Sequence, residues 1–174
     1  IQQFLSNQTN RRTDQYGGSL ENRLRFLTEV ITVCREAIGK DLALTLKLAG
    51  DELYEEGLHL PDMQKIVRHI DALGMIDMYV VASGNNLQRF ARIDHWPPTP
   101  APHGLHVRLA KGIREVTSTP VAALCRIVDP RHADQLIAEG SCDVVAMVRA
   151  TLADPDIANK ASEGRFEDIR PCVG

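Results

Sequence analysis

The chain has 174 residues, a length that fits one domain or part of a larger one. It is 44% hydrophobic and 25% charged, as ordinary globular proteins are, and no apolar run approaches the roughly 20 residues of a membrane-spanning helix. The net charge of −3 gives no electrostatic reason to expect nucleic acid or a membrane surface as a partner. Four cysteines without disulfide or C-x-x-C spacing favour free thiols in a reducing, cytoplasmic setting.

The N-terminal part of the chain predicts a loop followed by a helix. Residues 1–18 resemble a loop, because Gly17-Gly18 interrupts any regular element. Ser19 is a good helix N-cap, and apolar residues recur with helical spacing over 20–38, so we predict a helix that buries one face. Gly39 ends this helix.

Short apolar runs and amphipathic runs alternate through the remaining chain. They predict strand 42–49, helix 61–73, strand 76–82, helix 105–116, strand 120–127, helix 132–139, strand 143–151 and a last helix ending near 163. A long irregular segment, 87–103, carries His95 and His103, with His106 nearby; each histidine is a candidate for catalysis or for an ordinary surface position. The alternation indicates the α/β class, and the number of strands indicates half of an eight-fold barrel. We therefore expect the C-terminal half of a TIM (β/α)8 barrel, strands 5–8 with flanking helices.

Charged residues interrupt the predicted strands near their C-terminal ends. Arg126 and Arg149 end two consecutive strands, which places both at the edge where parallel-sheet enzymes bind ligands. Two guanidinium groups there suit a phosphate dianion; the alternative is that each arginine only solvates its strand end. Lys47 interrupts an apolar strand, so it either reaches the sheet edge or a partner, or extends its ammonium into solvent.

The segment Asn10-Arg-Arg-Thr-Asp-Gln-Tyr-Gly-Gly-Ser-Leu-Glu-Asn-Arg23, preceded by Gln3-Phe-Leu-Ser6, closely resembles the old yellow enzyme family (NADH:flavin oxidoreductases). The resemblance extends over the whole chain and includes Ala153-Asp-Pro155 and Asp168-Ile-Arg-Pro-Cys-Val-Gly174. The most similar branch is that of the iron–sulfur flavoenzymes: dienoyl-CoA reductase, trimethylamine dehydrogenase and N-methylproline demethylase. The resemblance implies that residues 1–174 are part of an FMN-binding TIM-barrel domain. It also implies that the N-terminal half and a downstream iron–sulfur region are absent from this chain.

The resemblance assigns expected FMN contacts to particular residues. Arg126 and Arg149 match positions that contact the FMN phosphate, together with backbone amides of the same turns. Cys125 and Val148 stand at two of these positions, where the family usually has glycine, so their side chains would narrow the phosphate pocket. Lys47 matches the cation, usually arginine, beside the flavin N1 and O2 edge, where positive charge stabilises the reduced flavin.

The resemblance also implies a metal cluster, a catalytic group and partners for the full-length protein. Cys172 matches the first cysteine of a Cys-x-x-Cys-x-x-Cys run that binds a [4Fe–4S] cluster, which needs four thiolates that this chain alone does not supply. His95 is the best candidate for a catalytic histidine in the loop after strand six. NAD(P)H and FAD are further cofactors to consider. We expect a small-molecule substrate, no nucleic acid or membrane partner, and a homo-oligomer of the full-length protein.

Three hypotheses for function remain at this point. The first is an FMN-dependent oxidoreductase that transfers a hydride between the flavin and either NAD(P)H plus an activated alkene or an N-methylated amine; Asn85-Asn86 and Trp96, without an obvious acid, favour the amine. The second is a sugar-phosphate-binding TIM-barrel aldolase or isomerase that uses the same two arginines. The third is an inactive fragment, because half a barrel exposes two sheet edges and tends to aggregate or dimerise.

Overall fold

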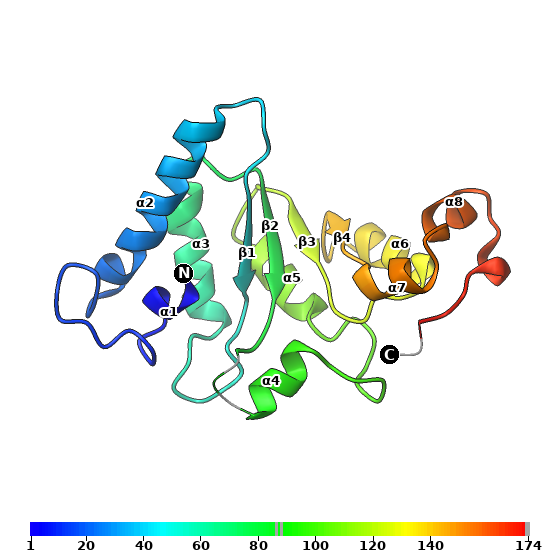
Figure 1. The fold of residues 1–174 in the computed structure, drawn as a ribbon, viewed down its shortest axis with the longest axis horizontal. Helices are drawn as coiled ribbons and strands as arrows, with labels where there is room; N and C mark the ends of the chain where they lie inside the picture. Colours follow the sequence, from blue (N-terminus) through cyan, green and yellow to red (C-terminus); the bar gives the residue numbers. More distant parts are fainter. Residues whose placement is uncertain (86, 88, 173–174) are drawn as a thin grey trace.

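The computed structural model describes residues 1–85, 87 and 89–172, apart from the side chain of Phe90. The described residues form one parallel sheet in the order β1-β2-β3-β4, so each strand lies beside the next one in the sequence (Figure 1). The strands are β1 (Thr45–Ala49), β2 (Met78–Ala82), β3 (Val121–Ala123) and β4 (Val144–Val145). The helices are α1 (Gln2–Leu5), α2 (Leu20–Ile38), α3 (Leu60–Asp71), α4 (Arg89–His95), α5 (Val107–Arg114), α6 (Pro130–Ala138), α7 (Val148–Ala153) and α8 (Ile157–Ser162), followed by a 3-10 turn (Phe166–Asp168). The α/β class with a parallel sheet is confirmed.

The hydrophobic core lies between the sheet and the helices α2, α3 and α5. Its most deeply buried side chains come from these helices and from β2 and β3: Leu27, Met63, Ile66, Ile70, Tyr79, Val81, Leu109, Ile113 and Val121. Helices α2 and α3 lie at the β1 end of the sheet, whereas α6, α7 and α8 gather at the β4 end (Figure 1). Within the described chain the two outer strands pair on one side only, as strands in a segment of a barrel do.

Helix α2 has the bounds that the sequence predicts. The Ser19 hydroxyl accepts a hydrogen bond from the Asn22 amide, and Gly39 ends the helix with a φ of 67°, a conformation that glycine adopts without steric cost. The apolar spacing buries Leu24, Leu27 and Ile31. Although α2 is the longest helix, neither it nor any other helix in the described ranges is long and apolar enough to cross a membrane.

The segment from Asn10 to Arg23 folds back on the N-terminal residues through side-chain bonds to backbone. The Asn10 amide donates to the carbonyls of Phe4 and Tyr16, at 2.7 Å each, and Arg23 Nε donates to the carbonyl of Leu5 at 2.7 Å. Each bond satisfies a carbonyl that no strand or helix pairs. The residues that carry the family resemblance in this segment therefore close a loop, and they lie outside the pocket described below.

Two short helices occupy segments for which the sequence predicts irregular structure. Helix α1 lies within 1–18 and α4 within 87–103, so both predictions are wrong at these places. Four and seven residues are too few for hydrophobic spacing to indicate a helix, and helices this short are stabilised by contacts with other elements.

The predicted strands 120–127 and 143–151 are also wrong in their extent, because β3 ends at Ala123 and β4 ends at Val145. Strand β4 contains only Val144 and Val145, and the Ala146 amide makes the final bond to β3 by donating to the carbonyl of Ala123 at 2.8 Å. Beyond that point the chain turns into helix α7. Among the described residues β4 pairs only with β3, and β3 ends at Ala123. Residues after Ala146 therefore have no neighbouring strand with which to form hydrogen bonds. Arg149 consequently lies in the first turn of a helix.

Candidate flavin-binding site

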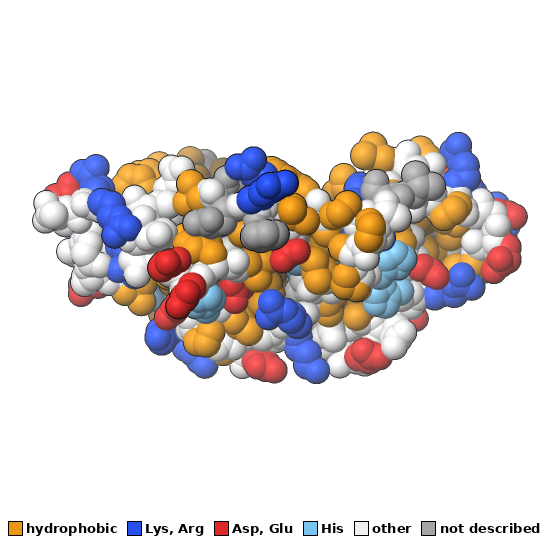
Figure 2. All heavy atoms as spheres, turned by 90° about the horizontal axis from the view of Figure 1, so that it is seen from below, with side chains coloured by type: hydrophobic (Ala, Val, Ile, Leu, Met, Phe, Trp, Pro, Cys, Tyr) orange, Lys and Arg blue, Asp and Glu red, His pale blue; other side chains and the backbone are white. Residues whose placement is uncertain are grey.

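A pocket of about 340 Å³ lies where β3 and β4 end, between Lys47 of β1 and His95 at the end of α4. The six residues that the sequence suggested for cofactor binding and catalysis all line it, although they come from four separate segments. The complete lining is Lys47, His95, Trp96, Pro97, Leu124, Cys125, Arg126, Ile127, Val128, Ala146, Met147, Val148 and Arg149. Figure 2 shows this end of the molecule, with hydrophobic side chains exposed across its middle and both signs of charge around them.

The turn after β3 places Arg126 inside the pocket. Cys125 and Arg126 both adopt positive φ angles, 89° and 51°, in the region that favours glycine, so the chain bends sharply there. The Arg126 side chain is only 8% exposed, and its buried Nε has no hydrogen-bond partner among the described residues. A buried, unpaired guanidinium nitrogen is costly, so this group is suited to an anion in the pocket. Cys125 is buried, and burial raises the pKa of its thiol, so it lines the pocket as a neutral group.

Arg149 reaches the same pocket from the start of α7. Its Nη1 donates to the carbonyl of Pro97 at 3.2 Å, which ties α7 to the segment that follows α4. Its neighbour Val148 lines the pocket but is 69% exposed. The expected narrowing of the pocket by Cys125 and Val148 stays a prediction.

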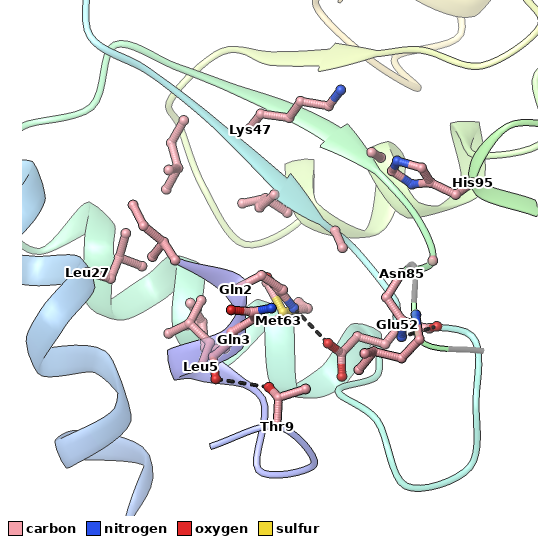
Figure 3. A pocket seen from close by; sticks show the side chains of 18 of the residues that line it. Gln2, Gln3, Leu5, Thr9, Leu27, Lys47, Glu52, Met63, Asn85 and His95 are labelled. Atoms are coloured by element: carbon pink, nitrogen blue, oxygen red, sulfur yellow. Dashed lines mark hydrogen bonds between the residues drawn. The ribbon is translucent and has the colours of Figure 1, made fainter. Parts of the chain in front are cut away.

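The third cation of the pocket, Lys47, extends from β1. It lies at the boundary with a second pocket of about 370 Å³, between β1, α1 and α3, and His95 lines both pockets (Figure 3). Within the described ranges none of Lys47, Arg126 and Arg149 pairs with a carboxylate. Three cations without acidic partners favour an anionic ligand.

His95 ends α4 with its imidazole held at one nitrogen. Nδ1 lies 2.5 Å from the carbonyl oxygen of Ser83, and because a carbonyl only accepts, Nδ1 carries the hydrogen. Nε2 is then the nitrogen that can accept a proton. The Trp96 ring contacts His95 edge-on, with ring centroids 4.5 Å apart. This arrangement suits proton transfer at Nε2 beside an exposed aromatic surface.

The sequence indicated His106 as a candidate histidine but connected neither His106 nor Ser83 with His95. Ser83 and His106 are 0% and 2% exposed, so His106 is not at the surface, whereas His103 is exposed. Burial lowers the pKa of His106, which favours the neutral ring. The signals in the sequence were the position of Ser83 directly after a predicted strand and the presence of His106 close to the irregular segment.

Cys172 lies half-buried near the end of the chain and is a free thiol. Across residues 1–85, 87 and 89–172 no group of three or more His, Cys, Asp or Glu side chains could hold a metal ion. Its role as a cluster ligand therefore stays a prediction about the full-length protein.

Comparison with known proteins decides the family. The model of the NADH:flavin oxidoreductase / NADH oxidase family matches residues 1–168. The chain belongs to this family. The resemblance to old yellow enzymes is thereby confirmed, and family membership favours the flavin hypothesis over the sugar-phosphate hypothesis.

Relatives within the NADH:flavin oxidoreductase family cover the whole chain. An N,N-dimethylglycine/sarcosine dehydrogenase from Chromohalobacter salexigens is 40% identical over 100% of this chain and 25% of its own length. A probable N-methylproline demethylase from Rhizobium meliloti is 34% identical over 100% of this chain and 26% of its own. The solved structure of histamine dehydrogenase from Rhizobium sp. 4-9 superposes with a TM-score of 0.86 at 36% identity, covering 99% of this chain and 24% of that one. The chain thus spans about a quarter of the length of these relatives, and the fold is confirmed as part of a TIM barrel.

The residues present fit the flavin mononucleotide that the family implies. The unpaired Nε of Arg126 and the guanidinium of Arg149 suit a phosphate, and Lys47 offers a positive charge across the same pocket. The apolar remainder of the lining suits a flat aromatic ring system.

Proposed function

We propose that the full-length protein is an FMN-dependent oxidoreductase that oxidises an N-methylated amine, with reduction of an activated alkene by NAD(P)H as the second candidate. The observation that carries this proposal is the pocket that brings Lys47, Arg126 and Arg149 together with His95. Residues 1–174 would contribute one part of a single FMN-binding barrel domain. Bound FMN would supply the hydride chemistry.

The residues of this chain have separate tasks in the proposal. Arg126 and Arg149 hold the phosphate through charge-assisted hydrogen bonds, which are stronger than neutral ones. Lys47 places positive charge at the flavin edge, and His95 accepts or donates a proton at Nε2.

The choice of an amine rests on the relatives and on Trp96. Several relatives are named for amines, among them the dimethylglycine/sarcosine dehydrogenase and a dimethylamine dehydrogenase from Hyphomicrobium. Trp96 is 63% exposed and lines the pocket beside His95, so its ring offers a face to a methylated ammonium group. Asn85 lines the neighbouring pocket. Asn86, the other residue that favoured an amine, lies outside the described residues.

An absorption spectrum of the full-length protein tests this function. The protein purified without added cofactor is expected to show flavin bands, and sarcosine or dimethylglycine added without oxygen is expected to bleach them faster than NADH does. Bleaching by NADH alone would replace the amine with the alkene reductase. A folded, colourless protein that takes up no FMN would contradict both.

Lys47→Gln is expected to lower the reduction potential of the bound flavin by about 30–60 mV. A cation stabilises the negative charge that reduction adds to the flavin, and the loss of one charge-assisted contact, about 1.5–3 kcal/mol, corresponds to a shift of this size for a two-electron couple. Potentiometric titration measures it. Lys65→Gln, which changes an exposed lysine on α3, is the control, and equal potentials in both variants would contradict the role of Lys47.

The remaining expectations concern the whole protein. We propose that Cys172 is one of four thiolate ligands of a [4Fe–4S] cluster, that the protein is cytoplasmic and that it is a homo-oligomer. Four free cysteines support the reducing setting. The role of Cys172 is tested by the visible absorption spectrum of the full-length protein. Cys172→Ser should remove the broad iron–sulfur shoulder and retain the flavin bands if Cys172 is a cluster ligand.

A further inference from the structure

A buried polar cluster lies behind His95, at the junction of β2, α4 and α5. His106 Nε2 is 2.5 Å from Ser83 Oγ and 2.8 Å from the carbonyl oxygen of Asp94. The carbonyl of the same Ser83 lies 2.5 Å from His95 Nδ1. Ser83 therefore contacts one histidine through its backbone and the other through its side chain.

The partners of His106 decide where its hydrogen lies. The carbonyl of Asp94 only accepts hydrogen bonds, so Nε2 must be the protonated nitrogen, shared between that carbonyl and Ser83 Oγ. Nδ1 is then a bare acceptor, and it is buried without a partner among the described residues. An apolar side chain in this space would avoid the cost of that unpaired nitrogen. Unlike an apolar side chain, a histidine at this position donates a hydrogen bond from Nε2 to the Asp94 carbonyl and Ser83 Oγ.

The cluster holds the end of α4 that carries His95. Asp94 is bonded to His106, His95 is bonded to Ser83, and Arg149 donates to the carbonyl of Pro97. Gly84 lets α4 approach closely, since a Cβ at Gly84 would lie 2.2 Å from the carbonyl oxygen of Ala91. The direction of the His95 ring therefore depends on Ser83, which lies outside the pocket, and the position of the neighbouring Asp94 depends on His106, which also lies outside it.

We propose that His106 is a positioning residue of the site, which fixes the His95 imidazole toward the pocket through Asp94 and Ser83. This inference rests on the proposed function, because it assigns a second histidine to the same reaction. His106 does not line the pocket. It acts by holding the backbone and the ring orientation of a residue that does. The charged groups that act on it are His95, Asp94 and Arg108.

The test uses the full-length, FMN-loaded protein and three substitutions. His106→Phe fills the space and removes the donor, His106→Gln restores an amide donor near the Nε2 position, and His103→Phe is the control at an exposed histidine. The dependence of kcat/KM on pH is measured with sarcosine, or with NADH if only NADH bleaches the flavin. His95→Gln identifies which limb of the profile belongs to His95.

We expect His106→Phe to lower kcat by about 10- to 100-fold, because a misplaced catalytic group costs rates of this order. In the pH profile of kcat/KM of this variant, the limb that belongs to His95 should shift or vanish, while the flavin content and KM stay unchanged. His106→Gln should recover most of the rate and the limb, and His103→Phe should behave like the unchanged protein.

Other outcomes separate this inference from the proposed function. A protein that binds no flavin contradicts the function itself. A flavin-loaded protein in which His106→Phe keeps the rate and the limb, or in which His95→Gln changes no limb, overturns only the positioning role. A His106→Phe variant that loses activity only in proportion to its loss of bound flavin also overturns the positioning role of His106. If His106→Phe does not fold, Ser83→Ala replaces it as the test, because it removes only the hydroxyl that contacts His106. A Ser83→Ala variant whose pH profile keeps the His95 limb unchanged overturns the proposal.

Discussion

Replacing Arg126 and Arg149 together by alanine is expected to leave the full-length protein without bound FMN. The two guanidinium groups line the proposed phosphate subsite, and the buried Nε of Arg126 has no other partner in the described part of the chain. Each charge-assisted contact is worth about 1.5–3 kcal/mol, so the double substitution should weaken FMN affinity by roughly 10²- to 10⁴-fold. If the two contacts are independent, each single substitution should weaken FMN affinity by about the square root of the factor for the double substitution.

The measurement is FMN binding by quenching of flavin fluorescence, supported by the absorption spectrum of the purified protein. Arg131→Ala is the matched control, because Arg131 follows the same loop but is exposed and pairs with Asp129. The pocket assignment is wrong if the double variant retains flavin at the same affinity as this control. Loss of FMN in the control as well would indicate a general effect of charge.

Glu52→Ala is expected to destabilise the barrel domain by about 2–6 kcal/mol. The carboxylate is 2% exposed and accepts hydrogen bonds from Ser6 Oγ at 2.8 Å, the Leu58 amide at 2.8 Å and Gln2 Nε2 at 3.1 Å (Figure 3 shows the bond to Gln2). Alanine would leave the buried Ser6 and Leu58 donors unpaired, at about 1–3 kcal/mol each. The loop after β1 would also lose its attachment to α1.

Urea unfolding followed by flavin fluorescence measures this destabilisation. Glu56→Ala, in the same loop but exposed, is the control and should change the free energy of unfolding by less than about 0.5 kcal/mol. Equal unfolding midpoints for the two variants would show that the network around Glu52 contributes little. Sequence inspection could not single out Glu52, because it stands among several acidic residues of one loop.

Local signals predicted some elements well and others not at all. Helix α2 has its predicted bounds because its cap, its apolar spacing and its terminal glycine all lie within 21 consecutive residues. The extent of β4 was wrong, because strand length depends on how far the neighbouring strand continues, and β3 is short. Helices α1 and α4 were missed, because contacts with distant residues stabilise them.

The sequence by itself determined the α/β class and, through its resemblance to the family, six residues that line one pocket. Parallel strand direction brings the residues that follow β3 and β4, among them Arg126 and Arg149, to a common edge of the sheet. Tertiary structure alone decided how these side chains are presented. The turn at Cys125 and Arg126 buries Arg126 Nε without a hydrogen-bond partner among the described residues, and the bond from His95 Nδ1 to the carbonyl of Ser83 leaves Nε2 as the ring nitrogen that can accept a proton. These features depend on backbone dihedral angles and on hydrogen bonds between residues far apart in the chain, which local sequence patterns do not encode.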